Sequence, residues 1–202
     1  MIKYVYKTNF PKGEDLMSTK VLQNKKTLSL KAKTVATLFS VACAVVIPQI
    51  FHILGAVSGL GTSLGEIFLP MHLPVILVGL FAGPCVGAVS GMLSPLASFA
   101  LTGMPLIANL PFMMLELCAY GLFAGLVSGV KMPSVAKVLA AQLAGRVVRI
   151  AALAVAFYLF DATKIAPVSV IYSLKTGLFG LVLQWTMIPL TLFYIESLSK
   201  HE

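Results

Sequence analysis

The chain has 202 residues, of which 58% are hydrophobic and 11% are charged, and its mean hydropathy is +0.95. Soluble domains carry about 25% charged residues, so this composition excludes an ordinary soluble protein and indicates an integral membrane protein. The length allows one compact bundle but no additional catalytic domain. The net charge of +8 does not indicate nucleic-acid binding, because eight of the fifteen Lys and Arg residues lie between the N-terminus and residue 33, where the first apolar segment begins. Basic residues in that position commonly set membrane orientation and contact anionic lipid.

The basic residues at the start define a separate stretch of the chain. We predict that residues 1–28 form a cytoplasmic segment and that residues 29–199 form the membrane domain. Met17 opens an alternative N-terminus, Met-Ser-Thr-Lys, and translation is expected to start there. An intact mass of the native protein that includes residues 1–16 would exclude that start.

Six apolar segments are long enough to cross a bilayer. A crossing needs about 20 residues, because a helix rises about 1.5 Å per residue and the hydrocarbon layer is about 30 Å thick. In chain order the segments are 33–54, 67–82, 84–102, 106–129, 134–160 and 170–197. Their apolar runs are continuous and do not alternate, which favours helices over a β-barrel. We therefore predict an all-α integral membrane protein, a bundle of six transmembrane helices.

The breaks between these segments contain Gly, Pro or charged residues, which are typical of helix ends. The second segment is short and contains Pro70 and Pro74. It is tilted, kinked or only partly spanning, and the sequence does not distinguish these three arrangements.

Lysines mark one side of the predicted bundle. Lys131 and Lys137 border the connection between the fourth and fifth segments, and Lys200 follows the last one. The connections 55–66 and 102–105 contain neither Lys nor Arg. Because short loops rich in Lys and Arg stay in the cytoplasm, we predict that both termini are cytoplasmic, which requires an even number of spans.

Small residues recur at every fourth position in three stripes. They are Ala32, Ala36, Ser40 and Ala44; Gly79, Gly83, Gly87 and Gly91; and Gly121, Gly125 and Gly129. Small residues let membrane helices approach closely. The two glycine stripes are expected to pack helices within the bundle. The first stripe begins at the cytoplasmic edge, and it either packs internally or contacts a partner protein.

Ionisable groups in the middle of a membrane are costly and usually functional. Glu116 lies roughly 15 Å into the fourth helix and Arg146 roughly 18 Å into the fifth from the other side, by helical rise. The two are therefore expected to lie at similar depth and to pair. Arg149 shares the helix face of Arg146, and Asn109 shares that of Glu116. Either Glu116 and Arg146 form a structural ion pair, or one arginine stays free to bind a carboxylate or phosphate.

Two further polar residues lie near the predicted outer side. Lys175, near the outer end of the last helix, either extends to the interface or contacts a ligand. His72 is expected to form a hydrogen bond with a ligand that enters from outside. His52 and His201 are expected to lie far from it, so no metal site is predicted.

Several chemical motifs are absent from the sequence. There is no G-x-x-x-x-G-K-[ST] loop for ATP, no H-E-x-x-H, and no histidine in the last three segments to activate a serine. Cys43, Cys85 and Cys118 lie in apolar stretches and are expected to be small buried residues. We expect neither enzymatic activity nor a cofactor.

The part of the chain from residue 68 to 105 carries the most specific pattern. It contains Phe68-Leu-Pro-Met-His72, Gly87-Ala-Val-Ser-Gly91-Met-Leu-Ser-Pro95 and Leu101-Thr-Gly-Met-Pro105. With Met114-Leu-Glu116 and Ala144-Gly-Arg146, these strings resemble the substrate-binding (S) components of energy-coupling factor (ECF) transporters. The similarity covers about residues 30–198.

The resemblance implies a six-helix subunit of a bacterial cell membrane that captures a vitamin or related micronutrient from outside. Such subunits associate with a transmembrane coupling subunit and two cytoplasmic ATPases. In that family an A-x-x-x-A pattern on the first helix contacts the coupling subunit. Ala32-Lys-Thr-Val-Ala36 matches this pattern, and Ser40 and Ala44 extend it.

The resemblance also implies where the substrate binds. The glycine-rich segment 55–65 is expected to cover the site, and the outer halves of helices four to six are expected to line it. This supports Asn109, Glu116, Arg146, its neighbour Arg149 and Lys175 as substrate-binding residues, with His72 at the rim. The cationic excess favours a carboxylate or phosphate, for example a pantothenate-like or folate-like compound. The alternative is a self-sufficient secondary transporter or channel, which would be expected to show internal repeat symmetry that is not evident here.

Overall fold

The computed structural model describes residues 28–61, 63–159 and 175–199, and within these residues all regular structure is helical. The helices are α2 (Leu30–Val57), α3 (Ser63–Phe68), α4 (His72–Ala82), α5 (Pro84–Thr102), α6 (Leu110–Val127), α7 (Ser134–Leu159) and α9 (Leu178–Ser199). Six stretches are long and apolar enough to cross a membrane, with α3 and α4 together forming one of them. The predicted all-α bundle of six spans is confirmed. The orientation of the termini stays a prediction, and Met17 lies outside the described residues.

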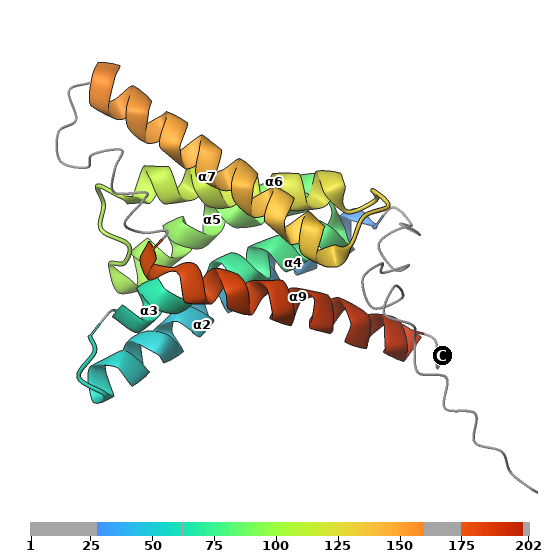
Figure 1. Ribbon diagram of the computed structural model, residues 1–202, viewed down its shortest axis with the longest axis horizontal. Coiled ribbons are helices and arrows are strands. Elements are labelled where there is room, and N and C mark those ends of the chain that lie inside the picture. The colour runs from blue at the N-terminus through green and yellow to red at the C-terminus, as the bar shows by residue number, and fades with distance from the viewer. Residues whose placement is uncertain (1–27, 62, 160–174, 200–202) are drawn as a thin grey trace, which may run out of the picture.

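Helix α6 occupies the centre of the bundle, where it packs against α4, α5 and α7. Helix α2 packs against α4 and α5, and α9 packs against α7 and α3. Figure 1 shows the long helices α7 and α9 on the face turned to the viewer, over the shorter α4 and α6. The core between them consists of fully buried apolar side chains, among them Val75, Ile76, Leu117, Ala124 and Ile188.

Local sequence signals explain where several helices begin and end. The hydroxyl of Ser29 accepts a hydrogen bond from the backbone N–H of Ala32 at 3.3 Å and caps the start of α2. Pro84 occupies the beginning of α5, where a missing N–H leaves no hydrogen bond unmade. Gly103 ends α5 in the left-handed conformation, with φ of 74°, and its N–H donates to the carbonyl of Phe99 at 2.8 Å.

The predicted second segment is a broken helix. Helix α3 ends at Phe68, and α4 begins only at His72. Between them Leu69 has a φ of 48°, which is strained for a residue with a side chain. Pro74 lies in the first turn of α4, where the helix does not need its N–H. The kinked arrangement is therefore the one observed.

The glycine stripes pack α5 against α6 and α4. A Cβ atom on Gly87 would collide with the carbonyl of Gly121, and one on Gly121 would collide with Gly87 in turn. Gly91 meets the backbone of Leu117 in the same way, and Gly125 meets Pro84. Since these collisions involve backbone atoms that cannot move aside, the helices come this close only because the residues are glycines. The prediction that these stripes pack the bundle internally is confirmed for Gly79, Gly87, Gly91, Gly121 and Gly125 but not for Gly129, where a Cβ would meet no atom within 4 Å.

The first stripe divides into two halves. Ser40 and Ala44 are buried at 2% and 0% exposure, and the hydroxyl of Ser40 donates to the carbonyl of Pro74 in α4 at 3.2 Å. This half packs inside the chain, so these two side chains are not accessible to a coupling subunit in this structure. Ala32 and Ala36 are partly exposed. The predicted contact with a coupling subunit therefore depends on Ala32 and Ala36.

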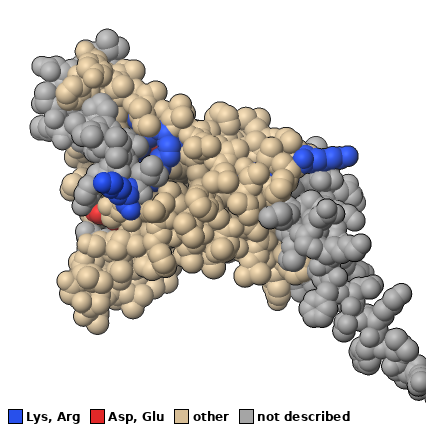
Figure 2. All heavy atoms as spheres, viewed as in Figure 1, with Lys and Arg blue, Asp and Glu red and all other residues tan. Residues whose placement is uncertain are grey.

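The rest of α2 presents large apolar side chains outwards, such as Phe39 at 71% and Val35 at 65% exposure. Figure 2 shows that the described surface on this face of the molecule is nearly free of charge, with Lys and Arg atoms gathered towards its two ends. An apolar middle with charged ends is the surface expected of a protein in a bilayer.

Lys137 borders the connection between α6 and α7, as predicted, but it is buried, and Cys85 is not buried as predicted. Lys137 is only 1% exposed, and its Nζ donates to the carbonyl of Ser128, just beyond α6, at 2.8 Å. A cation there stabilises the partial negative charge at the end of α6, so Lys137 belongs to the fold rather than to the surface. Cys85 is exposed, although all three cysteines were expected to be buried, while Cys43 and Cys118 are partly exposed. Cys85 is the second residue of α5, between Pro84 and Gly87, which both contact α6.

Candidate functional site

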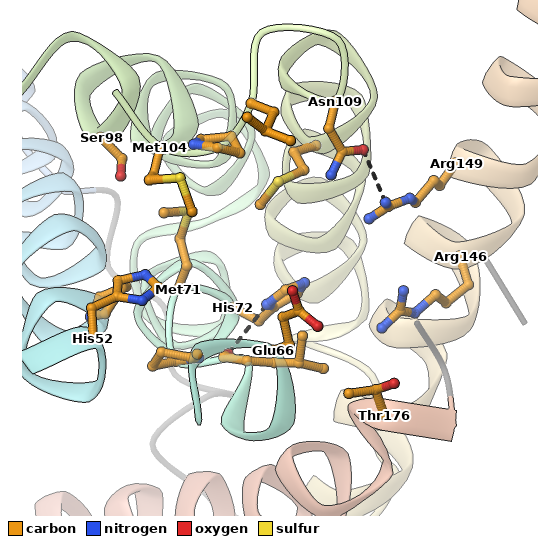
Figure 3. Close-up of a pocket in the computed structure, with 17 residues that line it drawn as sticks. His52, Glu66, Met71, His72, Ser98, Met104, Asn109, Arg146, Arg149 and Thr176 are labelled. Carbon is orange, nitrogen blue, oxygen red and sulfur yellow. Dashed lines mark hydrogen bonds between the residues drawn. The ribbon is translucent and has the colours of Figure 1, made fainter. Parts of the chain in front are cut away.

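A cavity of about 370 Å³ opens at the end of the bundle where α2 and α5 end and α6 and α9 begin. It is lined by residues of α2, α3, α4, α5, α6 and α7, by the segment 104–109 and by Thr176. Figure 3 shows polar side chains from these separate elements turned towards one space. The volume lies at the lower end of the range of about 300–1,000 Å³ that is usual for small-molecule sites.

One wall of the cavity is cationic. Arg146 and Arg149 project from the same face of α7, because they are three residues apart. Arg146 Nη1 lies 3.0 Å from Oε1 of Glu116, and Arg149 Nη1 lies 2.6 Å from Oε2 of the same carboxylate. The phenol of Tyr120 donates to Oε1 of Glu116 at 2.9 Å. Glu116 is fully buried behind the arginines and does not line the cavity itself.

The predicted pair of Glu116 and Arg146 is present, but it is part of a cluster of three. The expectation that one arginine stays free of the carboxylate is wrong, since each arginine contacts one oxygen of Glu116. Arg149 also donates from Nη2 to Oδ1 of Asn109 at 3.1 Å. Asn109 lines the cavity, as predicted from its spacing to Glu116. Because a buried carboxylate with two guanidinium partners fixes both of them, Glu116 holds the cationic wall in place.

His72 lies at the start of α4 and lines the cavity with only 5% of its surface exposed. Its Nδ1 is 3.2 Å from the carbonyl of Leu69, and its ring packs on that of Tyr120 with centroids 5.0 Å apart. A carbonyl can only accept, so Nδ1 carries the proton, and Nε2 of the neutral ring is an acceptor. That Nε2 is buried and has no hydrogen-bond partner among the described residues.

A hydrogen-bond chain supports the turn that carries His72. The carbonyl of Leu69 also accepts from Nε2 of Gln184 in α9 at 3.2 Å. Oε1 of Gln184 accepts from Nε2 of Gln142 in α7 at 2.9 Å, and Oε1 of Gln142 accepts from the indole of Trp185 at 2.7 Å. This chain connects α7 and α9 to the strained turn at Leu69. Trp185 thus donates the last hydrogen bond of this chain, and neither Trp185 nor Gln142 was predicted from the sequence to support the site.

His52 lines the same cavity as His72, so the expectation that it lies far away is wrong. Its ring contacts the position of Gly65, where a Cβ would collide with it, and this close approach brings α3 beside the end of α2. His52 lies near the end of α2, and His72 lies at the start of α4, the next helix but one. These positions were a signal that the two histidines could meet. Among the described residues, no three His, Cys, Asp or Glu side chains lie close enough together to hold a metal ion.

The predicted covering segment is largely helical. Helix α2 continues to Val57 and α3 occupies Ser63–Phe68, so the loop between them is short. Gly65 and Glu66 of α3 line the cavity. The ring of Phe68 packs between Phe51 and Phe179, with centroid distances of 4.8 and 5.2 Å. The segment thus lies beside the site, as the resemblance implies, but as a packed helix.

Lys175 is exposed and does not line the cavity, whereas its neighbour Thr176 does. This position fits a lysine that extends to the interface better than one that contacts a ligand. The remaining lining residues that the sequence did not single out are mainly apolar, with Met71, Met104 and Met113 among them.

Comparison of the chain with family models, with curated proteins and with solved structures found no match.

Proposed function

We propose that this chain is the substrate-binding subunit of an ECF-type importer in a bacterial cell membrane. In this proposal it binds a vitamin or related micronutrient and performs no chemistry, while separate coupling and ATPase subunits supply energy. The observation that carries the proposal is the cavity at one end of an apolar six-helix bundle, with the buried polar groups of Arg149 and His72 turned into it. Buried polar groups beside an apolar lining are typical of small-molecule sites.

The strings that resemble the ECF family contribute directly to this arrangement. His72 of the Pro-Met-His string lines the cavity, and Gly87 and Gly91 make the close contact between α5 and α6. Met104 and Pro105, from the last string, also line the cavity. The resemblance and the site therefore involve the same part of the chain, which supports the proposal more than either does alone.

A binding subunit is also favoured over a channel. The core of the bundle consists of fully buried side chains, including Val75, Ile76 and Leu80 of α4 and Tyr120 of α6, and none of these four lines the cavity. A path through the bundle would have to separate α4, α5 and α6 at their glycine contacts. Transport by a partner-driven movement of the whole subunit does not require that separation.

Reconstitution tests the proposal. The chain is co-expressed with ECF coupling and ATPase subunits and purified by a tag on the chain. We expect all the subunits to co-purify, and we expect proteoliposomes to accumulate a substrate only when ATP is available to the ATPases. Uptake by the chain alone, driven by a proton gradient, would favour a secondary transporter and contradict the proposal.

A matched pair of variants tests the coupling contact. Ala36→Trp places a large ring on the partly exposed half of the small-residue stripe, whereas Phe39→Trp makes a similar ring at a site that is 71% exposed. We expect Ala36→Trp to reduce co-purification strongly and Phe39→Trp to leave it unchanged. If Ala36→Trp assembles as well as the control, the contact is not on this face of α2.

A further inference from the structure

We infer that the cavity binds a small monocarboxylate that has an apolar body and a separate N–H or O–H donor. The inference rests on the proposed function only in taking this cavity as the substrate site. It names the charge and the hydrogen-bonding pattern of the substrate, which the resemblance does not supply.

The charge of the substrate follows from the cluster behind the cavity wall. Arg146 and Arg149 are each 9% exposed, and Glu116 is fully buried. Both arginines line the cavity, whereas Glu116 lies behind them, so this wall presents positive charge to a ligand in a place with little water. A single carboxylate on the ligand is attracted by this charge and can accept charge-assisted hydrogen bonds from the wall.

A phosphate monoester fits this wall less well. It carries about −1.5 to −2 charges at neutral pH, and Glu66, which also lines the cavity, would repel it more strongly than it repels a monoanion. A zwitterionic amino acid, in contrast, brings no net charge to compensate the cluster. A monoanion therefore fits this wall better than a dianion or a zwitterion.

Hydrogen-bond donors for a carboxylate are present on the same wall. Arg149 uses Nη1 for Glu116 and Nη2 for Asn109, but its Nε is buried without a partner among the described residues. The amide of Asn109 presents its oxygen to Arg149, and Figure 3 shows its nitrogen turned towards the cavity. A guanidinium edge beside an amide N–H suits the two oxygens of a carboxylate.

The donor on the substrate follows from His72. Its Nδ1 is held by the carbonyl of Leu69, so the buried Nε2 of the neutral ring can only accept. Figure 3 shows this ring and the two arginines facing the same space from different helices. A ligand that leaves Nε2 unpaired would maintain the cost of a buried unsatisfied acceptor, and a ligand with an N–H or O–H at that point removes it.

The body of the substrate follows from the rest of the lining. Met71, Met104, Met113 and Leu106 contribute apolar and flexible surface. Methionine side chains adapt their shape to a ligand at little cost, so this surface favours a flat or aliphatic group without prescribing its outline. The volume of about 370 Å³ limits the ligand to a small molecule.

Two matched series of compounds test the inference on the purified chain alone. The first series is indole-3-acetate, indole-3-acetamide, 1-methylindole-3-acetate, 3-indolyl phosphate and tryptamine. The second is 4-hydroxyphenylacetate, its amide, 4-methoxyphenylacetate and tyramine. Affinities come from the rise in Tm with concentration, up to millimolar levels.

We expect at least one acid to bind roughly 10- to 150-fold more tightly than its amide, the factor that a charge-assisted hydrogen bond supplies. Methylation of its N–H or O–H should weaken binding about 2- to 12-fold, the factor for one neutral hydrogen bond. Amides, phosphates or amines that bind as well as the acids would overturn the inference. Absence of binding by both acids would overturn it too.

Two variants test which residue causes the preference for acid over amide and which causes the effect of methylation. Arg149→Gln should remove the preference for acid over amide while the effect of methylation persists. His72→Leu should remove the effect of methylation while the preference for acid persists. If Arg149→Gln does not fold, the two series on the unaltered chain still decide. Because no coupling subunit or ATPase takes part, failure of ATP-driven uptake would contradict the proposed function without affecting this result, and the reverse also holds.

Discussion

Replacement of Glu116 by Gln should destabilise the protein more than any other single loss of a carboxylate in its described part. Glu116 is fully buried, and its two oxygens accept from Arg146, Arg149 and Tyr120. The glutamine keeps the shape but removes the negative charge that both buried guanidinium groups contact. Removing one partner of a buried ion pair typically costs about 3–5 kcal/mol. For a chain of this length that corresponds to a Tm lower by roughly 6–20 °C.

The assay is thermal unfolding in detergent, followed by the fluorescence of Trp185, which is the single tryptophan of the chain. Glu66→Gln is the matched control, because Glu66 is an exposed carboxylate of α3. Exposed substitutions usually change stability by less than about 0.5 kcal/mol, so the control should shift Tm by no more than about 2 °C.

The double variant Glu116→Gln with Arg149→Gln separates charge from shape. It leaves one buried positive charge, the same net charge as the unaltered cluster, and should recover part of the loss. If Glu116→Gln unfolds at the temperature of Glu66→Gln, the cluster does not stabilise the fold and its role as a charged support is refuted. If the double variant is no more stable than Glu116→Gln alone, the loss does not come from unpaired arginine charge.

Three further substitutions test other contacts. Gly87→Ala pushes α5 away from α6, which costs about 1–3 kcal/mol, and it should lower Tm by roughly 2–12 °C. Gly129→Ala should leave Tm unchanged, because no atom lies within 4 Å of the new Cβ. Lys137→Met removes a buried hydrogen bond to the carbonyl of Ser128 and should lower Tm, whereas exposed Lys131→Met should leave Tm unchanged; equal shifts would refute the buried role of Lys137. Gln184→Leu removes a hydrogen bond to the turn before His72 and should weaken binding of the acid probes about 2- to 12-fold; unchanged binding would show that the turn holds without it.

Hydropathy and helical rise were enough to predict the bundle and its central pair. The six spans follow from run length, and the common depth of Glu116 and Arg146 follows from counting inward from opposite ends of two neighbouring helices. Asn109 was placed correctly because seven residues make almost two helical turns. These features depend on position along single helices, which the sequence specifies directly.

The rest of the cavity and several contacts outside it depend on how the helices meet, which the sequence specifies only indirectly. His52 reaches the site because Gly65 lets α3 lie against its ring, and Lys137 is buried because the end of α6 needs a cation. Both contacts join residues from different helices, and neither leaves a periodic pattern. For the same reason the small-residue stripe of α2 could not be divided in advance into a buried half and an accessible half.

The sequence left two alternatives, a structural ion pair between Glu116 and Arg146 or an arginine that is free to bind a ligand, and the observed cluster combines features of both. Glu116 contacts both arginines, so each of them is held by a structural bond. Both guanidinium groups nevertheless line the cavity, whereas Glu116 lies behind them, so their positive charge faces a ligand. An arginine without a carboxylate partner would be free to move and would lose entropy when a ligand ordered it. Arginines already fixed by Glu116 avoid that loss, so the structural bond and the ligand site support each other.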